Sequence, residues 1–390
     1  MSRPAPPLAP ETVAVLACAQ WAVHERRLPR LRSALAACPS PERLCAEAAR
    51  HRMLGHLERG VCALGDAAPG PQLREVVTRR QVATGARCLQ QTARLLAMVE
   101  ELEGRGIPVM PIKGPAWGQR LYGDPALRNW TDLDLMVPYR LAPAAREVLF
   151  RAGFRDAVKY NERVRRLGDW AGKAVHLALP GEALNVDLHW AFGFGYSPHV
   201  FTAERLLGAG VTGSLLGRPV REPDQADLCC MLAVHGCGHA WSTVEPHLAL
   251  AVLLRRIEAR AWPGVLAVAR EAGCERRLVL SAAHVCRVLG LRLPALLAER
   301  LAEDGLLAAS LAWLAPCLLA AAEDPVESRM STLLWWLATE DSPRAAARHL
   351  LVRAALPGPH EWDSAPELPP LAWRHFAYRP LRLVRRWWRA

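Results

Sequence analysis

The sequence lacks paired-cysteine motifs. Its eleven cysteines are scattered and odd in number, and no Cys-x-x-Cys occurs among them. Free, reduced thiols are typical of cytoplasmic proteins, whereas small secreted proteins carry cysteines in disulfide frameworks. The first ten residues, MSRPAPPLAP, have prolines where a signal peptide needs an apolar helix. The sequence therefore predicts a cytoplasmic protein.

Long uncharged runs are also scarce. Residues 305–322 form one apolar stretch that approaches the length of a membrane span, which needs about 20 residues. The stretch contains Ser310, Trp313 and Pro316, and it is rich in alanine rather than leucine or isoleucine. We therefore predict a buried helix there rather than a membrane helix.

Acidic residues are absent from the last twenty positions. Residues 371–390 carry six arginines, which supply over half of the formal net charge of +11. A basic balance favours anionic partners such as nucleotides, nucleic acid or lipid headgroups. The mixture of arginine and aromatic residues suits a membrane-surface helix or a nucleic-acid patch. We favour a third interpretation, in which the aromatic side chains pack on the body of the protein.

β-Branched residues are sparse outside the middle third, which predicts an α+β protein with a small mixed sheet between two helical regions. Apolar spacing of three and four residues predicts helices on both sides of the sheet region. The predicted organisation is an N-terminal helical region (1–104), an α/β core (105–223), a C-terminal helical region (224–356), and a Pro-rich loop with the basic tail (357–390). Within the core, we expect strands at 107–112, 132–137, 176–179 and 184–190, and helices at 115–122 and 142–152.

Asp132 and Asp134 are separated by one residue on a predicted strand. Side chains alternate along a strand, so both carboxylates point to one face. Two like charges so close repel each other unless a cation lies between them, and Mg²⁺ is the hard cation that suits carboxylate ligands. Alone this pattern is weak evidence, because pairs of this kind are common on protein surfaces.

Two further features favour a phosphate and metal site. Lys113-Gly114 follows a predicted strand and precedes a helix that begins at Pro115, and free N–H groups at a helix N-terminus bind phosphate. Asp187 and His189 share one face of the strand 184–190. The third carboxylate suits a second metal ion, or a base for an attacking hydroxyl.

Other polar residues have more than one interpretation. Arg128 precedes the aspartate pair, and it either neutralises a triphosphate or pairs with a carboxylate. His176 and His189 are either core histidines or site residues. For His189 we favour the site, because it shares a face with Asp187.

His235 and His239 stand four residues apart on a predicted helix, a spacing that suits zinc. Gly236 and Gly238 loosen that helix, and no compact fourth ligand is evident among the neighbouring residues. We therefore favour helix residues near the active site or in the core.

Three motifs together resemble those of the bacterial uncharacterised nucleotidyltransferase family, which is similar to the DNA polymerase β nucleotidyltransferase superfamily. They are GIPVMPIKG at 106–114, the segment 122–137 with Arg128 and the aspartate pair, and VDLHW at 186–190. The resemblance extends over most of the chain, including a His-rich stretch at 235–241 and Arg379-Pro380-Leu381.

This resemblance implies a mixed-sheet nucleotidyltransferase core, two Mg²⁺ ions and in-line attack on the α-phosphorus of an NTP. Asp132 and Asp134 match the metal-binding pair, Asp187 the third carboxylate, and Gly114 the glycine after the first strand. The sequence departs from the superfamily in having Gly114-Pro115 instead of Gly-Ser, which removes one phosphate hydrogen bond that Lys113 would replace. The resemblance also implies an acidic residue after the Trp241 segment. Ala249 and Ala251 lie there instead.

The sequence thus predicts Mg²⁺-dependent transfer of NMP from an NTP, with ATP expected, to a hydroxyl of a small molecule, peptide or protein. Asp132, Asp134 and Asp187 would hold the metal, and the nucleotide would contact Lys113, Gly114, Arg128 and His189. A glycosyltransferase that uses the aspartate pair stays an alternative, and it would release a nucleoside diphosphate. A non-catalytic binding module derived from a transferase is another, and it would not bind NTP.

Overall fold

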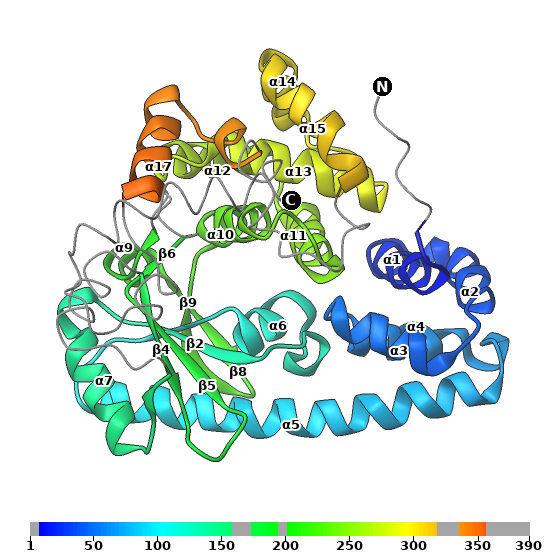
Figure 1. Cartoon of the computed structure of the whole chain (residues 1–390), viewed down its shortest axis with the longest axis horizontal. Helices are drawn as coiled ribbons and strands as arrows, with labels where there is room; N and C mark the ends of the chain where they lie inside the picture. The colour runs from blue at the N-terminus through cyan, green and yellow to red at the C-terminus, as the bar shows by residue number, and fades with distance from the viewer. Residues whose placement is uncertain (1–7, 158–172, 194–200, 318–334, 356–390) are drawn as a thin grey trace.

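Helices from both ends of the chain surround a small sheet in this computed structural model, as Figure 1 shows. The structure describes residues 8–157, 173–193, 201–317 and 335–355. The basic tail and the Pro-rich loop lie outside the described residues. The predicted α+β class is confirmed, with a mixed sheet at its centre.

The N-terminal region is a bundle of short helices, α1 (Pro10–Val23), α2 (Leu28–Ala36), α3 (Pro41–Arg50) and α4 (Leu54–Leu64). The long helix α5 (Pro71–Gly104) has 34 residues and is therefore about 50 Å long. Its first half packs on α3 and α4, and its second half packs on the sheet region. Figure 1 shows α5 running beneath both parts, so one helix joins the N-terminal bundle to the sheet.

The first strand is shorter than predicted. β1 covers Met110–Ile112, whereas the apolar run suggested a strand from Ile107. The Ile107 N–H instead donates to the Leu102 carbonyl at 3.0 Å, and Gly106, at φ +73°, donates to Glu103 at 2.9 Å. This pair of bonds is a Schellman cap, so Ile107 completes the end of α5 and does not enter the sheet.

The central sheet has the strand order β1-β2-β5-β4-β3. Its other strands are β2 (Asp132–Met136), β3 (Arg155–Asp156), β4 (Ala174–Ala178) and β5 (Asn185–His189), and the helices between them are α6 (Gly114–Tyr122) and α7 (Ala142–Arg151). β2 and β5 are parallel, and every other neighbouring pair is antiparallel. β1 is an edge strand, which is where Pro111 can be accommodated because proline has no N–H to donate.

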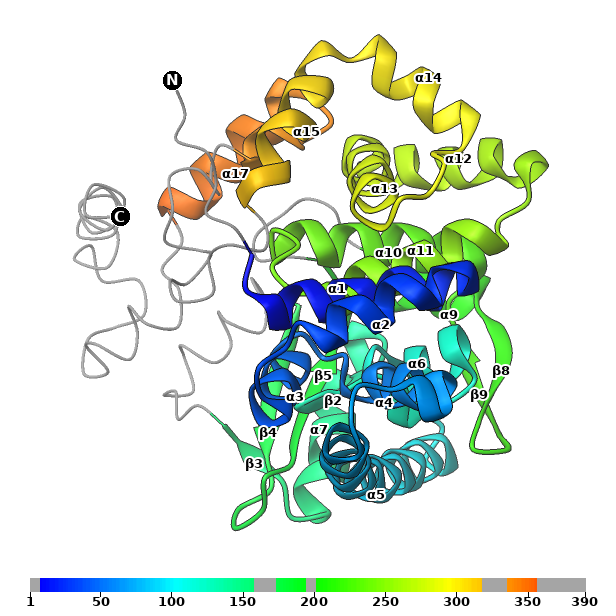
Figure 2. The same cartoon turned by 90° about the vertical axis from the view of Figure 1, so that its right-hand side faces the viewer.

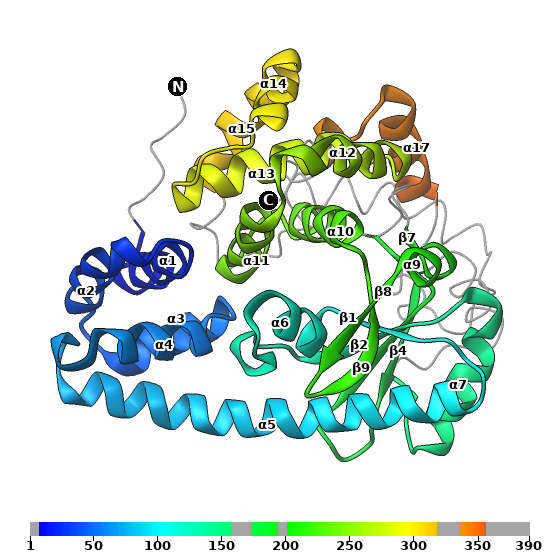
Figure 3. The same cartoon turned by 180° about the vertical axis from the view of Figure 1, so that it is seen from behind.

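The two faces of the sheet differ. Alternate residues such as Leu133, Leu135, Val186 and Leu188 are fully buried and form one hydrophobic cluster with α5 and α7. The other face carries Asp134, Asp187 and His189, and its apolar members belong to the cluster of the helical regions. The candidate site residues therefore share a face with side chains that pack against the helices of both ends. Figure 3 shows α10 and α11 above the sheet region and α1–α4 to its side.

The rest of the described chain, after β5, contributes short strands and further helices. Its elements are β6 (Ala191–Phe192), β7 (Phe201–Thr202), α9 (Ala203–Ala209), β8 (Val211–Leu215), β9 (Arg218–Glu222), α10 (Gln225–Gly238), α11 (Val244–Arg256), α12 (Trp262–Glu271), α13 (Glu275–Leu289), α14 (Ala295–Glu303), α15 (Gly305–Cys317) and α17 (Pro343–Ala355). α10 and α11 pack between α1 and the outer helices, as Figure 2 shows. N-terminal and C-terminal helices share one hydrophobic cluster.

Helix α15 differs from its prediction in burial. Within residues 305–312 Leu307 and Ser310 are buried, and most of the other side chains are exposed. The helix packs on α13 and α14 along one side, so the expectation of a buried helix was wrong for this stretch. No helix in the described part of the chain has the length and apolarity needed to span a membrane.

Candidate active site

Four polar side chains lie together on the sheet. In the parallel pairing of β2 with β5, Asp134 is directly beside Asp187, and in the pairing of β4 with β5, His176 is beside Asp187. His189 is two residues along β5 from Asp187, so it shares that face. Since neighbouring strands are about 4.8 Å apart, strand register alone brings these groups to one place.

Asp134 is 3% exposed and has two partners. Its Oδ1 is 2.8 Å from His189 Nε2, and the same oxygen forms an ion pair with the Lys113 ammonium. Burial raises the pKa of Asp134, but the charge of Lys113 and the hydrogen bond from His189 outweigh burial and lower the pKa to about 2. Asp134 is therefore a buried carboxylate at neutral pH.

These side chains have the donor set of a divalent-cation site. One ligand atom each from Asp134, Asp187 and His189 lie within 4.8 Å of one another, and no other group of this kind occurs among the described residues. Carboxylate oxygens are hard ligands that suit Mg²⁺, and imidazole is a borderline ligand. Two carboxylates leave coordination positions for phosphate oxygens and water, so the residues present fit Mg²⁺.

His176 extends this group toward solvent. Its side chain is 62% exposed, and its Nδ1 lies 2.6 Å from Asp187 Oδ1. The hydrogen bond with Asp187 raises the pKa of His176. The sequence left this histidine as a core or site residue, and the structure places it against the third carboxylate. Little in the sequence indicates this contact, because the alternation of side chains along β4 does not show which strand pairs with β4.

Asp132 lies at the margin of the group. It is on the same strand and face as Asp134, half-buried, and its Oδ1 accepts a hydrogen bond of 2.6 Å from Thr131. Two residues along a strand rise about 6.6 Å, which explains why Asp132 is not among the ligand atoms that lie within 4.8 Å. Its role as a metal ligand stays a prediction.

Lys113 and Gly114 form the turn from β1 into α6. Ile112 is beside Asp134 in the sheet register, so the residue that follows it emerges next to that carboxylate. Both Lys113 (φ +50°) and Gly114 (φ +38°) have left-handed backbones, which is rare for a lysine. Among the described residues no side chain caps the N-terminus of α6. Its first N–H groups remain free for a phosphate, except at Pro115, which has none.

The family of the chain follows from a sequence comparison. The model of the family described as uncharacterised nucleotidyltransferase matches residues 38–290, well over half of the chain. The chain belongs to this family. Its reaction class is therefore nucleotidyl transfer, and the predicted resemblance is confirmed. A search of curated proteins finds no match.

Two solved structures are similar to part of this nucleotidyltransferase. They are a solution structure of the antibiotic-resistance factor ANT(2'')-Ia and a crystal structure of ANT(2'')-Ia in complex with adenylyl-2''-tobramycin. Each is 16% identical, with a TM-score of 0.35, and covers 47% of this chain. The matches cover 92% and 98% of the respective neighbour chains.

Arg128 of the nucleotidyltransferase lies in a buried ion pair. Its Nε is 3.0 Å from Glu245 Oε1, and the side chains are 2% and 0% exposed. The Tyr122 hydroxyl donates to the same oxygen at 3.0 Å, and the guanidinium lies over the Trp117 ring at 5.3 Å from its centroid. Of the two interpretations of Arg128, the structure shows the carboxylate partner, and contact with the nucleotide stays a prediction.

Glu245 is a residue that the sequence interpretation missed. It follows Trp241 by four positions, at the start of α11, whereas the expected acid was sought near Ala249 and Ala251. Its backbone N–H donates to the His51 carbonyl at 3.2 Å, which joins α11 to the N-terminal helices. The acid in this segment therefore binds an arginine of the core rather than standing free for an acceptor.

Proposed function

We propose that this nucleotidyltransferase transfers NMP from an NTP, with ATP as the expected nucleotide, to a hydroxyl group in a Mg²⁺-dependent reaction. The observation that carries the proposal is the group of Asp134, Asp187 and His189 on one sheet face, with Lys113 bound to Asp134. Buried carboxylates from two neighbouring strands need a cation, and a lysine beside them suits a phosphate that arrives with it.

The metal ligands would be Asp134 and Asp187, with Asp132 completing a two-ion site. Bound Mg²⁺ would offset the negative charge of the triphosphate and polarise the α-phosphoryl group. His189 already binds Asp134 Oδ1, so it either orients this carboxylate or adds a nitrogen ligand.

Lys113 and the N-terminus of α6 would hold the phosphates. Lys113 is the N-cap residue of α6 and its ammonium pairs with Asp134, so this one side chain would link a phosphate at the helix N-terminus with the carboxylate. The N–H of Gly114 and the positive end of the helix dipole add to this attraction. These contacts replace the hydrogen bond that a serine at position 115 would have made.

Asp187 would accept the proton of the acceptor hydroxyl. The hydroxyl oxygen forms a bond to the α-phosphorus, the bond to the pyrophosphate oxygen breaks, and the proton passes to the Asp187 carboxylate. His176 holds Asp187 Oδ1 at 2.6 Å and thereby fixes the direction of the other oxygen. The acceptor is a small molecule, a peptide or a protein that approaches from the exposed side of β4.

The test is transfer of label from each α-³²P-labelled NTP, with Mg²⁺ and a cell lysate as the source of acceptors. We expect labelling by the wild type and none by Asp134→Asn or Asp187→Asn. Glu182→Gln, which removes an exposed carboxylate from the turn between β4 and β5, is the matched control and should label normally. Equal labelling by the wild type and both aspartate variants would show that the assignment is wrong.

The products distinguish nucleotidyl transfer from glycosyl transfer. The carboxylates that meet in the structure come from two strands, Asp134 and Asp187, rather than from the Asp132–Asp134 pair that a nucleotide-sugar site would use. Nucleotidyl transfer releases pyrophosphate, whereas a glycosyltransferase releases a nucleoside diphosphate. Detection of the diphosphate from a nucleotide sugar, without pyrophosphate from any NTP, would favour the alternative.

A further inference from the structure

One oxygen of Asp134 has two partners. The Lys113 ammonium forms an ion pair with Oδ1, and His189 Nε2 lies 2.8 Å from the same atom. Asp134 is also one of the three residues, with Asp187 and His189, whose ligand atoms lie within 4.8 Å of one another. The carboxylates that fit Mg²⁺ therefore have a positive charge of the protein itself beside them.

Lys113 and a divalent cation would compete for this carboxylate. Asp134 is 3% exposed, so little water screens the repulsion between two positive charges beside it. A metal ion that binds alone must therefore displace the ammonium or be repelled by it. In either case Lys113 weakens the binding of metal for as long as its ammonium has no other anion as a partner.

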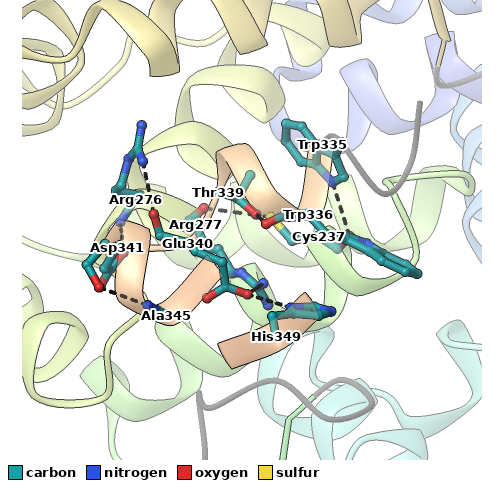
Figure 4. Close-up of polar contacts among 11 residues, drawn as sticks. Cys237, Arg276, Arg277, Trp335, Trp336, Thr339, Glu340, Asp341, Ala345 and His349 are labelled. Atoms are coloured by element: carbon teal, nitrogen blue, oxygen red, sulfur yellow. Dashed lines mark hydrogen bonds and ion pairs between the residues drawn. The ribbon is translucent and has the colours of Figure 1, made fainter. Parts of the chain in front are cut away.

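A second carboxylate, that of Glu340, has partners of the same kind. Arg277 Nη2 and His349 Nδ1 each lie 2.8 Å from Glu340 Oε1, among the contacts that Figure 4 shows. The Arg276 side chain donates to the Glu340 carbonyl at 2.9 Å, so the backbone of this residue is held as well. Glu340 belongs to no group of three possible metal ligands in the described part of the chain. This ion pair is a fixed structural one, and it serves as a comparison for Lys113.

Lys113 differs from Arg277 in the respects that matter for exchange. Its side chain is 18% exposed, whereas that of Arg277 is 1% exposed. Its ammonium is a compact charge on a flexible stem, whereas a guanidinium is a planar fork that holds a carboxylate in fixed geometry. Lys113 is also the N-cap residue of α6, the helix N-terminus proposed to take a phosphate. A second anion would therefore bind at the residue that neutralises the first.

We propose that Lys113 is an exchangeable counter-ion, which neutralises Asp134 until a triphosphate binds and then pairs with the phosphate, leaving the carboxylates to the metal ion. The role of the phosphate rests on the proposed function, whereas the competition between Lys113 and a metal ion does not. Metal and nucleotide then bind cooperatively, and each strengthens the binding of the other by the same factor. Metal without nucleotide binds weakly.

The first experiment is a titration with Mn²⁺ alone, followed by electron paramagnetic resonance, of the wild type and two variants at position 113. Methionine has about the length of lysine and no charge, so we expect Lys113→Met to bind Mn²⁺ about tenfold more tightly than the wild type, which corresponds to about 1.4 kcal/mol. Lys113→Arg keeps the charge and should bind no more tightly than the wild type. Neither substitution introduces a residue that is better suited to the left-handed backbone than lysine.

Melting temperatures separate this effect from a change in folding. Lys113→Met leaves the buried Asp134 without its charge partner, so without metal it should melt below the wild type. Mn²⁺ should then raise the melting temperature of Lys113→Met by more than that of the wild type, because a tighter ligand of the folded state stabilises more. Arg277→Gln, which removes the cation from Glu340, is the matched control. It should also melt lower, but its Mn²⁺ affinity should equal that of the wild type.

A third titration measures the coupling. Mn²⁺ binding is repeated in the presence of a saturating non-hydrolysable ATP analogue. The analogue should strengthen Mn²⁺ binding in both proteins, because phosphate oxygens are themselves metal ligands. The factor should be about tenfold smaller in Lys113→Met than in the wild type, because that variant has no ammonium for the phosphate to remove from Asp134.

The outcomes distinguish this proposal from the proposed function. Equal or weaker binding of Mn²⁺ alone by Lys113→Met, compared with the wild type, would overturn the exchange, whether or not NMP is transferred. Tighter binding by Lys113→Met, with no label transferred from any NTP by the wild type, would support the competition between Lys113 and metal and show that the proposed function is wrong. If Lys113→Met is unfolded and Mn²⁺ does not restore its fold, Lys113 is a structural partner like Arg277 and the exchange is also wrong.

Discussion

Arg128 and Glu245 form an ion pair in which both side chains are buried, and the pair joins the turn after α6 to the start of α11. The two residues are 117 positions apart in the sequence, and neither is on the sheet. α6 begins at the proposed phosphate site and ends at Tyr122, which also binds Glu245. The pair therefore fixes the helix that would face the nucleotide. An arginine expected at the triphosphate thus holds the framework of the site.

Removal of one partner from this pair should be strongly destabilising. Arg128→Met leaves the Glu245 carboxylate buried without its charge partner, and we expect a loss of about 3–5 kcal/mol in the free energy of unfolding, measured with urea. The double variant Arg128→Met/Glu245→Leu should be more stable than Arg128→Met alone, because no charge is then left buried. Arg94→Met removes the exposed ion pair with Glu182 and should cost under about 1 kcal/mol. An equal cost for both arginines would contradict the buried pairing.

The three aspartates should differ in how completely their loss removes metal. Asp134→Asn and Asp187→Asn remove carboxylates of the compact group, so we expect Mn²⁺ binding, followed by electron paramagnetic resonance, to be lost. Their transfer activity should fall by about a hundredfold or more. Asp132→Asn should retain the Mn²⁺ ion that Asp134 and Asp187 hold. It should still lose activity, because the second metal position of the proposed two-ion site is lost. A Mn²⁺ signal that disappears equally in all three would place Asp132 inside the compact group.

His176 should act as a positioning residue for Asp187. His176→Ala removes the 2.6 Å hydrogen bond with Asp187, and we expect kcat to fall about tenfold. A hydrogen bond to a charged group is worth about 1.5–3 kcal/mol when buried, and less at an exposed position such as this one. The KM for NTP should not change, because the side-chain contact of His176 is with Asp187 and not with Lys113. His176→Asn offers an amide N–H to Asp187 and should recover part of kcat. No recovery, with a changed melting temperature for both variants, would indicate a purely structural role.

The sequence was sufficient to predict which residues share a face, but not which strands are neighbours. Alternation along β2 and β5 placed Asp134 with Asp132, and Asp187 with His189. β5 pairs with β2 in the register that sets Asp134 beside Asp187. About fifty residues connect the two strands, and a local sequence pattern does not encode the path of that connection. The extent of β1 was likewise decided by the cap at Gly106 rather than by the apolar run.

Long-range pairing explains the other gaps. The partner of Arg128 is on a helix over a hundred residues away, and the hydrogen bond from the Glu245 N–H to the His51 carbonyl requires the N-terminal and C-terminal helices to share a core. Gly236, which suggested a loosened helix, is instead demanded by packing, because a Cβ there would overlap the Trp241 ring. Such contacts follow from tertiary structure and leave no spacing signal in the sequence.

Stability should fall with acid because of a buried histidine pair on α11 and α13. His247 Nδ1 lies 2.8 Å from the Thr243 carbonyl and must donate to it, so His247 Nε2 accepts from His284 Nε2 at 3.0 Å. Burial lowers the pKa of His247 to about 4, below the unfolded value near 6.5. The unfolded chain then binds the extra proton, so the contribution is complete above pH 6.5 and is lost as pH falls toward 4.

Between pH 7 and pH 5 this single group should lower the free energy of unfolding by about 2 kcal/mol. Urea titrations at both pH values measure the difference. His247→Gln removes the titrating group, so its stability should be lower at pH 7 but should change less with pH than that of the wild type. If both proteins lose the same stability between the two pH values, His247 does not carry the effect.

Two substitutions at the end of α10 should have opposite signs. Ala240 has a left-handed backbone at φ +47°, so Ala240→Gly relieves strain and should raise the free energy of unfolding by about 1 kcal/mol. Gly236→Ala, four residues earlier, would push a methyl group into the Trp241 ring and should cost about 1–3 kcal/mol. Urea unfolding of the two variants tests both halves. A Gly236→Ala variant that is as stable as the wild type would mean that Trp241 does not pack against α10 as the structure shows.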